Sequence, residues 1–160
     1  MGDTQLLLPL FEWFEATSAG RIVRESLWMF PVLEAIHLVG LAVLGGALLV
    51  VDLRLMGVGL RDSTIKEIDR QARPWLMGAI TLLLVTGVLL FLSESIKCYY
   101  NTAFWVKMMT LPFAIVFTFF VKERFARTAL YTSAYSQWIA GADLLLWFIV
   151  AAGGRWIGFS

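Results

Sequence analysis

Residues 27–51 read LWMFPVLEAIHLVGLAVLGGALLVV, an apolar stretch that contains two ionisable side chains, Glu34 and His37. A helix of this length crosses the ~30 Å hydrocarbon core of a bilayer at about 1.5 Å per residue. Glu34 and His37 are three residues apart, so they share one face of that helix. Ionisable groups at such depth cost a few kcal/mol or more and normally face a bundle interior that offers a partner, a cofactor or water. We therefore expect the function of the protein on this face.

The composition predicts an all-α integral membrane protein, because 59% of the 160 residues are hydrophobic and only 16% are charged. Three further apolar stretches complete a single transmembrane domain over residues 1–160, a four-helix bundle. The N-terminus lacks the basic region of a signal peptide and is expected to be retained as an interfacial helix, with apolar residues interleaved with acids. The expected elements are an interfacial helix at about 5–18 and spans at about 27–51, 75–93, 104–121 and 138–156.

The charged residues lie mainly in the connections between spans. Residues 61–74 read RDSTIKEIDRQARP and predict a short surface helix that ends before Pro74. The loops after the first and third spans carry eight Lys and Arg residues and the opposite side four, which predicts a bacterial inner-membrane protein with both termini in the periplasm. Asp52 and Asp143 fall in the cytoplasmic half, where we expect them to pair with loop cations. A net charge of +1 gives no footprint for nucleic acid.

With this topology, several polar side chains converge on the outer half of the bundle, and a haem is one use of them. His37 is the only histidine and would be the axial ligand of the iron. Lys107 and Arg155 would neutralise the propionates, and Glu34 lies on the same helix face as the histidine. Met108, or the methionine after it, would supply a sixth ligand, unless the iron stays five-coordinate. The cofactor expected on this reading is haem b.

The same residues allow other readings. His37 can hydrogen-bond Glu34 or a polar group on another helix and only fix the packing, which suits a non-catalytic subunit of a larger membrane complex. Glu34, His37 and Lys107 can also form a proton relay or part of a metal transport element. A di-iron carboxylate site would need a second Glu-x-x-His motif, and the sequence has no second histidine.

Four segments carry a resemblance to known sequences: FEWFEAT, RESLWMFPVLEAIHLVGLAVLGGALLVVDLRLMG, FWVKMM and GRWIGF. In these segments the chain resembles a largely uncharacterised family of small bacterial four-span membrane proteins. The first span also has a His-x-x-Gly, a basic loop precedes a proline, the second span has a late Thr-Gly pair, and the third starts with Trp-x-Lys. In this pattern the chain is more distantly similar to the haem-containing, flavin-free protoporphyrinogen oxidase of bacteria and to copper-resistance membrane domains.

The resemblance to the oxidase implies roles for two residues. The histidine of the first span is the haem ligand in that family and the lysine of the third span is functionally important, and these fall on His37 and Lys107. A haem-dependent membrane oxidoreductase is therefore one expectation. Its electrons would come from or go to quinone or a periplasmic redox partner, and other membrane subunits or a second copy of the chain are further expected partners beside the lipid bilayer.

Overall fold

The computed structural model describes residues 7–60, 62–129 and 131–158, and in these ranges helices are the only regular secondary structure. Four helical segments are long and apolar enough to cross a membrane, so the chain is a multi-pass membrane protein with the predicted four-helix bundle. The elements are, in order, α1 (Leu8–Glu15), α2 (Ser18–Glu25), α3 (Met29–Leu55), α4 (Ile65–Ser93), α5 (Ser95–Tyr100), α6 (Thr102–Val116), the π-helix η2 (Phe117–Lys122), α7 (Glu123–Thr128) and α8 (Ala134–Ile157).

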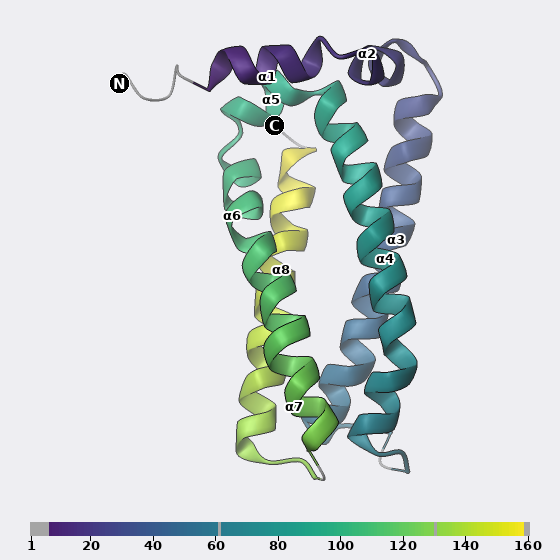
Figure 1. Ribbon diagram of the computed structural model, residues 1–160, viewed down its shortest axis with the longest axis vertical. Helices are drawn as coiled ribbons and strands as arrows, with labels where there is room; N and C mark the ends of the chain where they lie inside the picture. Colours follow the sequence, from purple (N-terminus) through teal and green to yellow (C-terminus); the bar gives the residue numbers. More distant parts are fainter. Residues whose placement is uncertain (1–6, 61, 130, 159–160) are drawn as a thin grey trace.

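The long helices run side by side, and the short helices α1, α2 and α5 lie across one end of them (Figure 1). We call this the lid end, and we call the opposite end, with residues 56–60, 62–64, 129 and 131–133, the loop end. Helix α3 packs mainly on α4, and α6 packs mainly on α8. The two pairs are joined by contacts of α4 with α7 and of α3 with α8, the latter including hydrogen bonds at the loop end from Ser136 to the Leu55 carbonyl and from Gln137 to the Met56 carbonyl.

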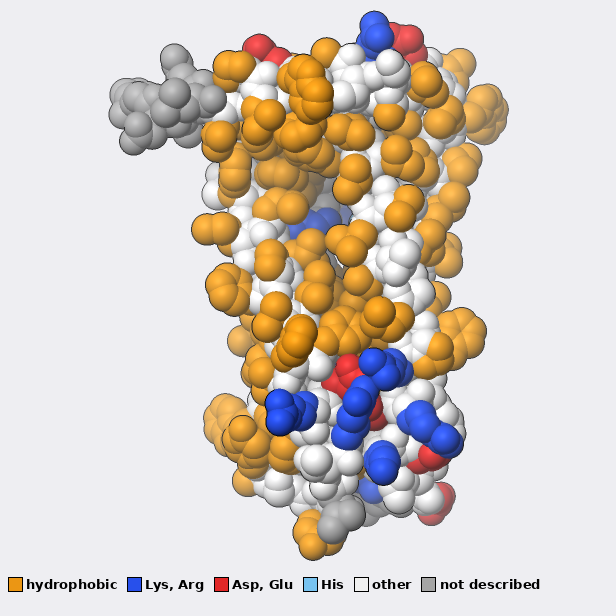
Figure 2. Space-filling model, viewed as in Figure 1, with side chains coloured by type: hydrophobic (Ala, Val, Ile, Leu, Met, Phe, Trp, Pro, Cys, Tyr) orange, Lys and Arg blue, Asp and Glu red, His pale blue; other side chains and the backbone are white. Residues whose placement is uncertain are grey.

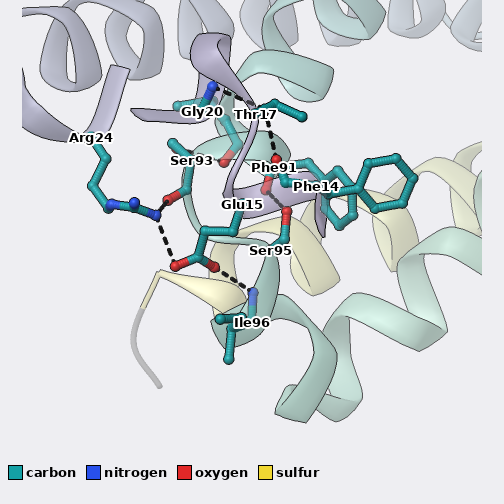
Figure 3. Close-up of polar contacts among 10 residues, drawn as sticks. Phe14, Glu15, Thr17, Gly20, Arg24, Phe91, Ser93, Ser95 and Ile96 are labelled. Carbon is teal, nitrogen blue, oxygen red and sulfur yellow. Dashed lines mark hydrogen bonds and ion pairs between the residues drawn. The ribbon is translucent and has the colours of Figure 1, made fainter. Parts of the chain in front are cut away.

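The lid consists of two helices, whereas the sequence predicted one at about 5–18; residues 5 and 6 lie outside the described ranges. The chain turns at Thr17, whose side chain accepts a hydrogen bond from the Gly20 backbone and so caps α2. Glu15 fastens the lid to the bundle (Figure 3): one carboxylate oxygen accepts from the Ile96 backbone N–H at 2.7 Å, and the other pairs with Arg24 at 2.8 Å. The lid is thereby fixed where α4 meets α5.

Helix α4 does not end before Pro74, and the prediction of a separate surface helix is wrong. Thr64 caps the helix at its start, and Pro74 stands inside it. The physical reason is packing, because the buried face of α4 continues without a break from Ile65 and Ile68, before the proline, to Leu76 after it. A continuous apolar face stabilises the helix enough to offset the hydrogen bond that proline removes.

The third span is longer than the predicted 104–121 and runs from Thr102 to Thr128 with a π-helical segment inside it. The fourth span, predicted at 138–156, runs from Ala134 to Ile157. A π-turn adds a residue to the turn and so changes which side chains face inward. In this segment the inward side chains are Thr118 and Lys122, both about 1% exposed.

Three apolar clusters stack along the bundle. The lid cluster joins Phe11 and Phe104, the middle cluster contains Leu44 and Trp147, and the loop-end cluster contains Leu55. Two groups of polar side chains lie beside the middle cluster. The group around His37 is toward the lid end, and the group around Lys122 is toward the loop end.

Candidate functional site

His37 forms a short hydrogen bond to a second helix. Its Nδ1 atom lies 2.7 Å from the Thr86 hydroxyl oxygen on α4, and that hydroxyl also lies 2.7 Å from the carbonyl oxygen of Leu82 one turn earlier. A carbonyl can only accept, so the single hydroxyl proton goes to Leu82. The imidazole must then donate from Nδ1. In the neutral form of a ring that donates from Nδ1, the lone pair is on Nε2.

The Nε2 atom of His37 has no hydrogen-bond partner among the described residues. Gly87, next to Thr86, leaves room for the ring, since a Cβ at that position would lie 3.4 Å from the imidazole Cε1. A histidine whose Nδ1–H is held by the protein while Nε2 stays bare has the arrangement of a metal-ligating histidine. The Thr86-Gly87 pair thus provides a seat that orients the imidazole.

Lys107 stands on α6 opposite this seat. Its stem packs on α8, where Cβ atoms added at Gly153 and Gly154 would come within 3.2 Å of the lysine side chain. The ammonium group forms no hydrogen bond or ion pair with any described residue, yet it is near enough for its charge to act on the His37 ring. An unpaired cation inside a membrane span favours an anionic group beside it.

The two side chains lie in a layer between the lid cluster and the middle cluster. Along α6, Lys107 comes between Phe104 of the lid cluster and Ala114 of the middle cluster, and along α3, His37 is seven residues before Leu44. Figure 2 shows a hollow at this height between the two columns of helices, with a Lys or Arg side chain inside it. The hollow separates the α3–α4 pair from the α6–α8 pair.

The other residues predicted for the site do not join His37 in the hollow. Glu34 is exposed on the outer surface of α3 and contacts no polar group among the described residues. Met108 is 42% exposed and Met109 is 70% exposed, so both methionines face outward on α6. Arg155 is exposed in the last turn of α8, at the lid end. The structure thus brings together His37 and Lys107 from the predicted set.

A second polar cluster lies toward the loop end. In it Asp52 and Asp143 pair with Lys122, which confirms the prediction that they pair with a cation that follows a span. The ammonium nitrogen of Lys122 is 3.0 Å from Asp52 Oδ1 and 2.5 Å from Asp143 Oδ2. All three side chains are 1% exposed or less. Thr118 and Trp147 complete the cluster, since the Trp147 indole donates to the Thr118 hydroxyl at 2.8 Å and this hydroxyl is 2.7 Å from Asp143 Oδ1.

Two features of these sites were missed by sequence reasoning. Thr86 was recognised only as one of a Thr-Gly pair, and Lys122 only as a loop cation outside the third span. The signal for Thr86 was its place among apolar residues in mid-span, where a hydroxyl needs a partner. For Lys122 the signal was weaker. Its side chain faces the bundle interior because of the π-helical segment, and no sequence pattern predicts such a segment.

Among the described residues, no group of three or more His, Cys, Asp and Glu side chains is placed to hold a metal ion. A family model described as a family of unknown function, DUF6644, matches residues 10–160. The chain belongs to this family. No curated protein and no solved structure matches it.

Proposed function

We propose that this DUF6644 protein is a membrane b-type haem protein with a redox role, in which His37 Nε2 is an axial ligand of the iron. The observation that carries the proposal is the bare Nε2 atom of an imidazole whose other nitrogen is held by Thr86. A porphyrin supplies four nitrogen ligands of its own, so one protein imidazole suffices to hold it. A bound haem would supply one-electron chemistry.

The surroundings of His37 fit a flat anionic group. Gly87 on one wall and Gly153 and Gly154 on the other keep bulky side chains out of the hollow. Lys107 offers an ammonium group that has no partner among the described residues, and it would pair with a propionate. Thr86 would hold the ring plane of His37 through Nδ1, which raises the basicity of Nε2. Met108 is 42% exposed and faces outward, so His37 is the residue that would hold the iron.

The proposed location is the bacterial inner membrane with both termini in the periplasm. The support is the excess of Lys and Arg in the loops after the first and third spans, which lie at the loop end. The His37 hollow is then in the periplasmic half of the bilayer, where a quinone or a periplasmic redox protein can exchange electrons with it. Oxidation of a porphyrin, the activity implied by the resemblance to protoporphyrinogen oxidase, is one form of this role.

An absorption spectrum tests the proposal. The full-length chain is expressed with an ample supply of haem precursor and purified in mild detergent, and its oxidised and reduced spectra are compared with those of His37→Ala. We expect a Soret band that His37→Ala loses. Glu34→Gln is the matched control, because Glu34 is one turn away on the same helix and points outward.

Two outcomes would overturn the haem proposal. One is a colourless wild-type preparation despite full haem supply. The other is a Soret band that His37→Ala leaves unchanged, because the haem would then be held elsewhere. The colourless preparation would favour the second candidate function, whereas an unchanged Soret band would remove His37 from the haem site.

The second candidate is a non-catalytic subunit of a larger membrane complex, and the hydrogen bond between His37 and Thr86 favours it. That bond joins α3 to α4 and is the contact a purely structural histidine would make. In this case His37→Ala lowers the stability of the chain in detergent while the purified protein stays colourless.

A further inference from the structure

The buried cluster at the loop end has one negative charge too many. Asp52 and Asp143 are both 0% exposed, and among the described residues Lys122 is the one cation that forms an ion pair with them. Two carboxylates and one ammonium leave a net charge of −1 among side chains that are 1% exposed or less. Such a charge is strongly disfavoured in a dry interior, and binding a proton removes it.

Neighbouring charges do not correct the imbalance. Asp69 and Arg73 from α4 and Glu123 and Arg127 from α7 lie next to the cluster, and Glu123 forms ion pairs with both arginines. With these included, four carboxyl groups face three cations. One negative charge is still left over.

The hydrogen bonds of Thr118 point to where the proton is. Its hydroxyl oxygen lies 2.8 Å from the Ala114 carbonyl, 2.7 Å from Asp143 Oδ1 and 2.8 Å from the Trp147 indole nitrogen, which donates. One hydroxyl proton cannot serve both oxygen atoms. If it goes to the carbonyl, as helical threonine protons do, the contact with Asp143 needs a proton from the carboxyl group.

Asp52 is a second, independent indication. Its Oδ1 lies 3.0 Å from the Lys122 ammonium, and neither of its oxygens makes a hydrogen bond of normal geometry with any described residue. A fully buried carboxylate normally has its lone pairs satisfied. Asp52 is therefore poorly prepared to carry a full negative charge beside Asp143.

We propose that the Asp52–Asp143 pair binds one dissociable proton, shared between the two carboxyl groups and held in place by Lys122 and Thr118. The proton comes from water at the loop end and adds to a carboxylate oxygen, so no other reactant is needed. Asp69, Arg73 and Glu123 line a narrow crevice beside Lys122 and Thr118 at this end of the bundle. Figure 2 shows Lys and Arg side chains around acidic ones on this part of the molecule. The proposal does not depend on a haem at His37.

Infrared spectroscopy of the full-length protein in lipid nanodiscs tests the proposal. A protonated carboxyl group has a carbonyl stretch well separated from the carboxylate bands, and it shifts in deuterium oxide. We expect such a band in the wild type and its loss in both Asp52→Asn and Asp143→Asn, because each variant leaves one carboxylate for one ammonium. Glu67→Gln is the control, since Glu67 pairs with Arg70 at the surface of the same end, and it should keep the full band.

Labelling the wild type with carboxyl-¹³C aspartate keeps the test valid if the two asparagine variants do not fold. The label must then move the band, and Asp69→Asn must leave it in place, because Asp69 is the other buried aspartate of this end. The proposal is overturned if Asp52→Asn and Asp143→Asn both retain the band at full intensity. It is equally overturned if the label moves no protonated-carboxyl band, or if only Asp69→Asn removes it.

Discussion

Replacing Lys122 by methionine is the most direct probe of the loop-end cluster. Methionine keeps most of the length and apolar volume of the lysine stem, so the substitution chiefly removes the ammonium group. That group is within 3.0 Å of Asp52 and 2.5 Å of Asp143. Lys122→Met therefore leaves two carboxyl groups facing each other, both fully buried and without a cation in contact.

The magnitude follows from the burial of all three groups. Removing one partner of a buried ion pair costs about 3–5 kcal/mol, because the remaining charge is left without compensation. Because the three side chains are only 0–1% exposed, the loss of unfolding free energy for Lys122→Met should lie in that range. It should lie toward the upper end, because two carboxyl groups lose their cation. A loss of this size lowers the folding equilibrium constant by roughly two to four orders of magnitude.

Unfolding in mixed micelles, followed by helical circular dichroism, measures the free energy of unfolding. Lys66→Met is the matched control, since Lys66 is exposed near the same end and should change stability by less than about 0.5 kcal/mol. The triple variant Asp52→Asn, Lys122→Met, Asp143→Asn should recover most of the loss, because no buried charge remains. A loss below about 1 kcal/mol for Lys122→Met alone would refute the view that the ammonium compensates both carboxyl groups.

Three further predictions concern the lid and the His37 seat. Gly20→Ala should destabilise the protein by about 1–3 kcal/mol, measured in the same unfolding assay, because its Cβ would lie 2.3 Å from the Leu92 carbonyl oxygen. Thr86→Val should shift the redox potential and broaden the absorption bands of a haem at His37, because Nδ1 loses the acceptor that orients the ring. Burial raises the pKa of the Cys98 thiol from 9.0 to about 11. A maleimide should therefore label the folded protein far more slowly at pH 8 than the unfolded protein. The free energy of unfolding should fall as the pH rises from about 9 to 11, because in this range the thiol loses its proton only in the unfolded protein.

Each of these predictions has an internal control. Gly46→Ala places a Cβ where no atom lies within 4 Å, so it should not destabilise the protein as Gly20→Ala does. Thr86→Ser keeps the hydroxyl and should resemble the wild type in its spectrum. Labelling of Cys98 in denaturant should proceed at the rate of an ordinary thiol. Equal effects of the two alanine variants, a Thr86→Ser spectrum like that of Thr86→Val, or rapid labelling of the folded Cys98 would contradict the respective reasoning.

The membrane architecture could be predicted because it depends on composition over long windows. Four apolar stretches gave four spans, and the structure has four helices of that character. The ends of the helices could not be predicted as well. Pro74 reads locally as a helix boundary, but the buried face of α4 continues through it, so tertiary packing decided against the local signal.

The candidate site could be predicted only as far as single residues on one helix. His37 and Lys107 were selected because ionisable groups in apolar spans are costly, and that argument holds for each residue alone. Glu34 was selected by the same argument, and it faces outward because α3 meets α4 on the side of His37, Gly40 and Leu44. Which face meets a neighbour depends on how all the helices are rotated, and a single sequence does not contain that information.

The two polar sites share one construction, and it explains why threonine recurs in them. A threonine within a helix donates its hydroxyl proton to the carbonyl one turn back, as Thr81, Thr86, Thr110 and Thr118 are all placed to do here. Its oxygen then has only lone pairs left for a neighbouring helix, so the neighbour must bring the proton. At Thr86 the proton comes from His37 Nδ1, and His37 Nε2 has no partner among the described residues. At Thr118 it falls on the Asp143 carboxyl group and places a proton in a cluster whose charge requires one. In both places a hydroxyl that is committed to its own backbone decides the protonation state of the functional group beside it.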